Sequence, residues 1–416
     1  MRKLLAPLVV LGLLVGGIGA AGASVHADDS GVTKDQIKVG VTYVDVAALR
    51  SAGIKIDHGD YETSFRTVID DINAKGGVNG RKIVPIFAPV NPVGTDPSQK
   101  ACLELTEDQK VFAVVGFFLN DGPLCYVEQH KTPVLGGTMT SEYLARAKAP
   151  WYTLEPGDPD IGLVVDAFAN ERLLTKGKLG IVTHSQEKSL LDGVVLPALK
   201  KQKISGSSAI IDAPPSDTAA AEAQASTIVE RFKTDGVKTI LLVGNSVAAI
   251  SRALAKTSYR PRLIGTSASV MTSYARDPSS DLSVIQNAVS ASIGRDFNDP
   301  ALQSCYQMVS KATGESIVEY PAKDQPSNVT SADQACRYMT LFTALATAAG
   351  KNLTTASFAK AGQKAGSVQL PGSGSITYDP KTHEFNQPVY LYRYDPATKQ
   401  IVKDPEPVGG NAASSR

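Results

Sequence analysis

The chain has 416 residues, of which 42 are Lys or Arg and 41 are Asp or Glu, so its formal charge at pH 7 is +1. This length is enough for two domains of ordinary size. A charge this balanced, without a basic block, argues against the phosphate neutralisation that nucleic-acid binding requires, so we expect no nucleic-acid partner.

The first 27 residues have the pattern of a secretory signal peptide. Arg2 and Lys3 precede an apolar run over 4–23, and small or apolar residues surround Ala27, where we predict cleavage. An uncleaved membrane anchor is the alternative, because about 20 apolar residues can span a bilayer. No cysteine lies near the cleavage point to carry a lipid. We therefore expect a secreted or periplasmic protein, whose 389 mature residues carry a formal charge of −1 once Arg2 and Lys3 are lost.

The first part of the mature chain alternates apolar strands with amphipathic helices. We predict strands at 37–43, 82–90, 111–118 and 132–137, and helices at 60–75, 97–109, 123–130 and 141–147. Four residues share one face of the first helix: Phe65, Val68, Ile69 and Ile72. Asp60 can cap the start of this helix, and Gly76 can adopt the left-handed conformation that ends it.

A second set of elements repeats this alternation. The predicted strands are 178–184, 207–212, 238–244 and 262–267, and the predicted helices are 159–175, 187–202, 218–235 and 246–258. Nearly continuous apolar strands between helices are typical of parallel sheets that helices cover on both faces. The sequence therefore predicts an α/β protein of two Rossmann-like lobes, and the Pro-rich stretch 154–160 is the natural crossing between them.

The pattern changes after residue 300. Helices are expected near 301–313, 332–349 and 355–366, followed by strands at 374–379 and 388–395. The last residues, 403–416, are rich in Pro, Gly, Ser and Ala, a composition typical of a disordered tail.

Four cysteines remain after signal removal, which suggests two disulfides in an oxidising compartment. Of the three possible pairings we favour Cys102–Cys125 and Cys305–Cys336, because each pair is close in sequence and flanks helices. Free thiols are the alternative. No pair has CxxC spacing and no grouping of histidines has metal-ligand spacing, so we predict neither a metal site nor a cofactor.

The stretch "INAKGGVNGRKI" over 72–83 combines a helix end, a tight turn and a strand start. Together with "VFAVVGFF", "TPVLGGTMT", "RLIGTSA" and "GSITYDPKTHEF", it resembles the type I periplasmic solute-binding proteins of branched-chain amino-acid ABC transporters. The resemblance covers about 35–400. It implies two lobes joined by a three-strand hinge, with the ligand in the cleft between them.

The resemblance also implies how the chain divides. The N-terminal lobe would contain 32–153 plus about 296–370, and the C-terminal lobe 154–295 plus about 371–402. The glycine-rich turn itself joins a helix to a strand, so it should lie at the end of the sheet away from the ligand.

The residues that directly follow the strands are the candidates for ligand binding, because open α/β sheets bind ligands beyond the carboxyl ends of their strands. The candidate ligand contacts are Tyr43, Asp45, Phe118, Asn120, Asp121, Thr138, Met139, Thr140, His184, Ser189, Ser246 and Ser267. The resemblance implies that hydroxyls such as Thr138 or Thr140 hold a carboxylate.

The second lobe departs from the family pattern. Amino-acid binders of the family carry an acidic residue after the strand that matches "RLIGTSA", where this sequence has Thr266, Ser267 and Ala268. An unpaired buried ammonium is costly. We therefore expect a small neutral or carboxylated ligand, amino acid-like or aromatic, although Asp45 or Asp121 could replace the missing acid.

The predicted function is delivery of a solute to the permease of an ABC importer by a monomeric, non-catalytic binding protein. A ligand-sensing domain for a signalling partner is the alternative. A secreted serine hydrolase is a poor third, since "GNSVA" at 244–248 lacks the last glycine of a nucleophile elbow.

Overall fold

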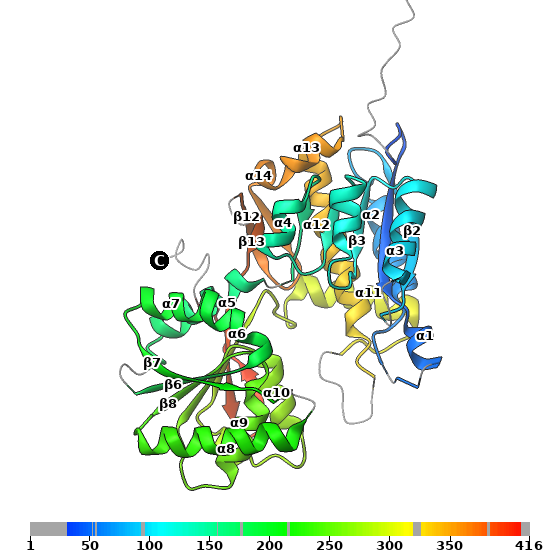
Figure 1. Cartoon of the computed structure of the whole chain (residues 1–416). Helices are drawn as coiled ribbons and strands as arrows, with labels where there is room; N and C mark the ends of the chain where they lie inside the picture. The colour runs from blue at the N-terminus through cyan, green and yellow to red at the C-terminus, as the bar shows by residue number, and fades with distance from the viewer. Residues whose placement is uncertain are drawn as a thin grey trace, which may run out of the picture.

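The computed structural model describes residues 31–408, apart from 52, 55, 93–95, 156, 175–177, 214–216, 319–325 and 381–382. The described residues form two lobes, each with its own β-sheet (Figure 1). The predicted signal peptide and its cleavage point lie outside the described residues.

The first lobe contains a five-stranded parallel sheet in the order β2-β1-β3-β4-β5. Its strands are β1 (Gln36–Val44), β2 (Lys82–Val90), β3 (Ala113–Gly116), β4 (Val134–Gly136) and β5 (Trp151–Tyr152). Its helices are α1 (Val46–Ser51), α2 (Tyr61–Ala74), α3 (Asp96–Leu103) and α4 (Ser141–Arg146), joined by π-helical turns at Glu104–Asp108 and Cys125–Gln129.

Four helices return to this lobe late in the chain: α11 (Pro300–Thr313), α12 (Val329–Ala349), α13 (Thr355–Ala359) and α14 (Ala361–Ala365). The long helix α12 is buried along much of its length, and Phe342 packs in one core with Phe65 of α2 and Val39 of β1. The predicted helix over 355–366 is interrupted at Lys360, which separates α13 from α14.

The second lobe contains a seven-stranded mixed sheet in the order β15-β14-β10-β9-β8-β6-β7. Its strands are β6 (Leu179–His184), β7 (Gly206–Ile211), β8 (Thr239–Leu242), β9 (Arg262–Gly265), β10 (Val289–Ile293), β14 (Val389–Asp395) and β15 (Gln400–Lys403). Its helices are α5 (Asp158–Asn170), α6 (Lys188–Leu190), α7 (Leu196–Lys201), α8 (Thr218–Thr234), α9 (Val247–Ala255) and α10 (Ala268–Arg276).

The tail was predicted incorrectly in part. Lys403 ends β15, and residues 404–408 continue beyond it along β14, where the backbone N–H of Asp404 donates to Leu391 O and that of Val408 to Val389 O, both at 2.7 Å. Val408 also packs against the core of the second lobe. The apolar side chain of Val408 and these backbone bonds outweigh the Pro-rich composition.

A third sheet changes the expected division of the chain. It is antiparallel and contains β11 (Ser367–Leu370), β12 (Gly374–Asp379) and β13 (Glu384–Asn386). Its buried residues Val368, Ile376 and Phe385 belong to the core of the first lobe. The predicted boundary near 371 was therefore wrong, and the last crossing comes after β13. Aromatic packing decides the position, because the rings of Tyr378 and Phe385 lie 5.4 and 6.1 Å from that of Tyr152.

Three segments cross between the lobes, as the resemblance implied. The first follows β5 and leads to α5, the second follows β10 and leads to α11, and the third joins β13 to β14. The first two crossings leave the carboxyl ends of β5 and β10. The carboxyl ends of the parallel strands in the two sheets therefore face each other.

The glycine-rich turn has the predicted conformation. Gly76, Gly77, Asn79 and Gly80 have φ values of 105°, 65°, 50° and 85°, and the N–H of Gly77 donates to Ile72 O at 3.0 Å, which ends α2. The turn precedes β2, so it lies at the amino edge of the sheet, away from the facing edges.

Both predicted disulfides are present. Cys102–Cys125 joins α3 to the π-helical turn at Cys125–Gln129, and Cys305–Cys336 joins α11 to α12. Among the described residues, no helix is both long and apolar enough to cross a membrane.

Candidate functional site

The first-lobe candidates near β1 line one shared cavity. Tyr43 and Asp45 border a cavity of about 610 Å³ at the carboxyl end of this strand. The Tyr43 hydroxyl donates to Glu62 Oε1 at 2.7 Å, and its ring stacks on Tyr61 with centroids 5.4 Å apart. Burial and the neighbouring Glu62 carboxylate raise the pKa of Tyr43, which keeps the hydroxyl protonated as a donor. Asp45 accepts from the N–H of Ala48 and so caps α1.

The candidates after β3 and β4 are arranged differently. Phe118 is half-buried and packs edge-on against Tyr126 at 5.6 Å, and Met139 is buried in the same core. The exposed candidates at this edge are Asn120, Asp121, Thr138 and Thr140. Thr140 also caps α4 by accepting from the N–H of Tyr143 at 3.2 Å.

Two second-lobe candidates are buried within their own lobe. The Ser246 hydroxyl lies 3.1 Å from both Val182 O and Val243 O, to which it donates. His184 Nδ1 lies 3.1 Å from Ala213 O, and its side chain is buried. Each side chain therefore satisfies a backbone carbonyl of its own lobe, and in the described part of the chain the hydrogen bonds of the Ser246 hydroxyl go to backbone carbonyls and not to a base.

The other second-lobe candidates are more accessible. Ser189 is exposed, and Ser267 caps α10 by accepting from the N–H of Val270. The structure thus brings Tyr43 and Asp45 to one cavity but does not gather the remaining candidates with them.

Sequence reasoning missed a carboxylate at the facing edge of the second lobe. Glu187 follows β6, and its Oε1 accepts from Asn245 Nδ2 at 2.9 Å and from the Asn245 N–H at 3.2 Å. Gly244 makes this approach possible, because a Cβ there would lie 2.1 Å from Glu187 Oε1. The expected acid after β9 is absent, but this lobe still has an acid next to its carboxyl edge.

A buried guanidinium ties the three crossings together. Arg337 of α12 donates from Nη2 to Gly294 O at 3.0 Å, to Ser373 Oγ at 2.8 Å and to Gln387 Oε1 at 3.0 Å. Gln387 Nε2 in turn donates to Leu154 O at 3.1 Å. Gly294, Gln387 and Leu154 lie on the second, third and first crossings, so one side chain of the first lobe connects all of them.

A cavity of about 360 Å³ lies beside this hinge and is lined by both lobes. The first lobe contributes the start of α12, and the second lobe contributes the start of α10 and Tyr392 of β14. Arg295 of the second crossing reaches Asp333 of α12, with Nη1 2.5 Å from Oδ2. The Tyr306 hydroxyl donates to the other oxygen of Asp333 at 2.9 Å, and burial together with this carboxylate raises the pKa of Tyr306. No sequence motif marks these residues.

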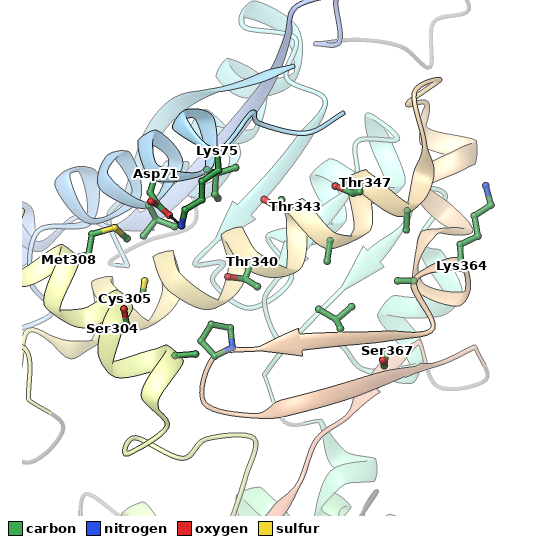
Figure 2. A pocket seen from close by; sticks show the side chains of 18 residues that line it. Asp71, Lys75, Ser304, Cys305, Met308, Thr340, Thr343, Thr347, Lys364 and Ser367 are labelled. Carbon is green, nitrogen blue, oxygen red and sulfur yellow. Dashed lines mark hydrogen bonds and ion pairs between the residues drawn. The ribbon is translucent and has the colours of Figure 1, made fainter. Parts of the chain in front are cut away.

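A larger cavity, of about 800 Å³, lies on the first lobe alone (Figure 2). It lies among α2, α11, α12 and β11, and Asp71 and Lys75 pair beside it at 2.6 Å. None of its lining comes from the second lobe. Lobe closure therefore does not act on it directly.

The described residues contain one grouping with the proximity of metal ligands, formed by Cys102, Cys125 and His130. Both cysteines are in a disulfide. A disulfide sulfur is not the thiolate that binds metals, so this grouping does not fit a metal.

Several solved structures have a similar fold. The substrate-binding protein of an ABC transporter from Desulfitobacterium hafniense, in complex with Leu, is 13% identical with a TM-score of 0.60, over 89% of this chain and 100% of that chain. A leucine-, isoleucine-, valine-, threonine- and alanine-binding protein from Brucella ovis is 13% identical with a TM-score of 0.60, over 89% and 94%. A fatty acid ABC transporter substrate-binding protein from Thermomonospora curvata is 16% identical with a TM-score of 0.56, over 93% and 96%.

A sequence search of curated proteins finds no significant match. The family described as periplasmic binding protein matches residues 36–400, which is most of the chain and contains both lobes and all three crossings. This chain therefore belongs to the periplasmic binding protein family, whose members bind solutes and are not enzymes.

Proposed function

We propose that this protein is an exported solute-binding protein that captures a small molecule between its lobes and delivers it to the permease of an ABC importer. The observation that carries the proposal is the cavity at the hinge, because residues of both lobes line it. A ligand in such a cavity contacts both lobes only when they are close together. It therefore favours the closed state by its differential affinity for that state.

The family match supports solute capture, and the roles of the similar solved structures in ABC transport support delivery to a transporter. We propose that the exposed candidates Asn120, Asp121, Thr138, Thr140 and Ser189, together with the half-buried Ser267, contact the solute or the opposite lobe on closure. We further propose that the protein acts as a monomer outside the cytoplasm, because its predicted signal peptide directs export and each lobe has its own core.

The test is lobe closure on solute binding. Small-angle X-ray scattering of the chain without its predicted signal peptide should show a smaller radius of gyration once a solute binds. Thermal unfolding against a panel of amino acids, amides, aromatic acids and fatty acids identifies the solute, since a ligand at 100 times its Kd adds about 2.7 kcal/mol of stability. A solute that stabilises the protein without changing the scattering would contradict the closure mechanism.

A further inference from the structure

Two helices, one from each lobe, begin at the cavity beside the hinge. Ala268 and Ser269 begin α10, and Val329 and Thr330 begin α12. The first N–H groups of a helix have no acceptor within the helix, and they carry the positive end of its dipole. One N–H group at each helix start already has an acceptor, because Ser267 Oγ accepts from Val270 of α10 and His58 O accepts from Ser331 of α12. Among the described residues, Asn328 adds no side-chain bond at the start of α12. Hydrogen-bond donors of both lobes thus border one cavity.

Two guanidinium groups line the same cavity and keep unused donors. Arg295 has 38% of its side chain exposed, and in the described part of the chain only its Nη1 has a hydrogen-bond partner. Arg337 is 6% exposed, and its buried Nε has no hydrogen-bond partner among the described residues. Unpaired buried polar atoms are costly, so their presence at one cavity indicates a missing polar partner.

The charge of the cavity favours an anion. Asp333 and Glu155 offset the formal charges of Arg295 and Arg337. Both acids are already engaged, because Asp333 accepts from Arg295 and from Tyr306, and Glu155 accepts from the Tyr338 hydroxyl at 3.2 Å. The two helix starts then leave the cavity with a net positive character of about half a charge each.

The remaining lining combines the hydroxyls of Ser269, Ser292 and Thr330 with aromatic and aliphatic side chains. Phe297, Tyr338 and Tyr392 contribute rings, and Leu154 and Ile293 contribute aliphatic side chains. The Arg295 guanidinium also lies 4.8 Å from the centroid of the Phe297 ring, so charge and apolar surface are adjacent. A ligand that matches this lining has an anionic head and a compact apolar body.

We infer that the cavity is a carboxylate site, and that the solute is a small aromatic or aliphatic carboxylate whose oxygens bind Arg295 and the starts of α10 and α12. This inference rests on the proposed function, because it names the chemical class of the transported solute. It places the carboxylate at the hinge and not at Thr138 or Thr140. An α-ammonium group is not required by this cavity, since both of its acids already accept hydrogen bonds.

The test compares compounds that share an apolar body and differ in the head group, which is replaced in most of them and gains an α-ammonium in leucine. Phenylacetate, phenylacetamide and phenethylamine form one series, and 4-methylpentanoate, its amide and leucine form another. Titration calorimetry should show binding of at least one of the two carboxylates, with at least about tenfold weaker binding of its amide, because charge-assisted hydrogen bonds are stronger than neutral ones. Equal binding of the amide or the amine, or no binding of either carboxylate, overturns the inference.

Variants locate the site. Arg295→Gln should weaken carboxylate binding by about 10- to 100-fold, the loss expected for a charged hydrogen bond, and Arg295→Lys should restore part of it. Arg146→Gln is the matched control, because Arg146 is also partly exposed and paired, at 2.8 Å to Glu128, but lies outside the cavity. If Arg295→Gln binds within twofold of the unchanged protein while remaining folded by circular dichroism, the assignment is wrong.

A capture experiment separates this inference from the proposed function. The protein is dialysed against an equimolar mixture of amino acids, amides, amines and carboxylates, and the retained compound is identified by mass spectrometry. A retained carboxylate supports both proposals. A retained compound without an acid group overturns the inference but leaves the solute-binding function intact, whereas retention of nothing counts against both.

Discussion

Replacing Arg337 with Met should destabilise the protein more than removing any surface charge. The side chain is 7% exposed and donates to Gly294 O, Ser373 Oγ and Gln387 Oε1 at 2.8–3.0 Å. Methionine nearly fills the volume of the arginine side chain, so the loss of stability comes from the lost charge and hydrogen bonds. Gly294 O keeps the Ser373 hydroxyl as a donor, but Gln387 Oε1 loses its only described donor.

The magnitude follows from which partners survive. Removing one partner of a buried charged network costs about 3–5 kcal/mol. Asp333, the nearest acid, keeps both Arg295 and Tyr306 as hydrogen-bond donors in this variant. We therefore expect the lower end of this range, about 3 kcal/mol, in the free energy of unfolding measured with urea.

The matched control is Arg393→Met. Arg393 pairs with Asp404 at 2.9 Å, but 46% of its side chain is exposed. An exposed pair of this kind contributes at most about 1 kcal/mol. If Arg337→Met also lies within about 1 kcal/mol of the unchanged protein, the buried network does not hold the hinge and our reasoning fails.

Three further predictions concern other parts of the molecule. Replacing Cys305 and Cys336 together by Ser should lower the free energy of unfolding by about 3–4 kcal/mol in urea, because the bond closes a loop over a separation of 31 residues; a loss under about 1 kcal/mol would contradict this. Burial lowers the pKa of His58 below its ordinary 6.5, against the smaller opposing effect of Asp57, so an NMR titration should show a midpoint below 6.5. The unfolded chain then takes up the proton first, and the stability present above pH 6.5 is lost as the pH falls; His58→Gln should flatten this loss, and an unchanged slope would show that other groups cause it. Ser246→Ala should cost about 1–2 kcal/mol through its lost hydrogen bonds and leave solute affinity unchanged; a tenfold fall in affinity by calorimetry would restore Ser246 as a ligand contact.

Local sequence patterns were sufficient to predict most of the secondary structure. Asp60 accepts from the N–H of Thr63, as its place before the apolar period predicted, and Asn79 and Gly80 adopt the positive φ that the turn requires. These features depend on neighbours within a few residues. The strand β10 was missed because Ser290 and Ser292 interrupt its apolar pattern, although Ser290 is buried in the sheet.

Long-range contacts decided the rest. The sheet β11–β13 joined the first lobe because its rings pack on Tyr152, more than 200 residues earlier in the chain. The candidate site shows the same limit: Arg337 reaches Gly294 and Gln387 across sequence separations of 43 and 50. The sequence by itself determined the alternation of strands and helices, the caps and the turns, because each is set by local geometry. Only the tertiary structure decided which lobe each late segment joins and which charges meet at the hinge, because those depend on surfaces that come together after the chain has folded.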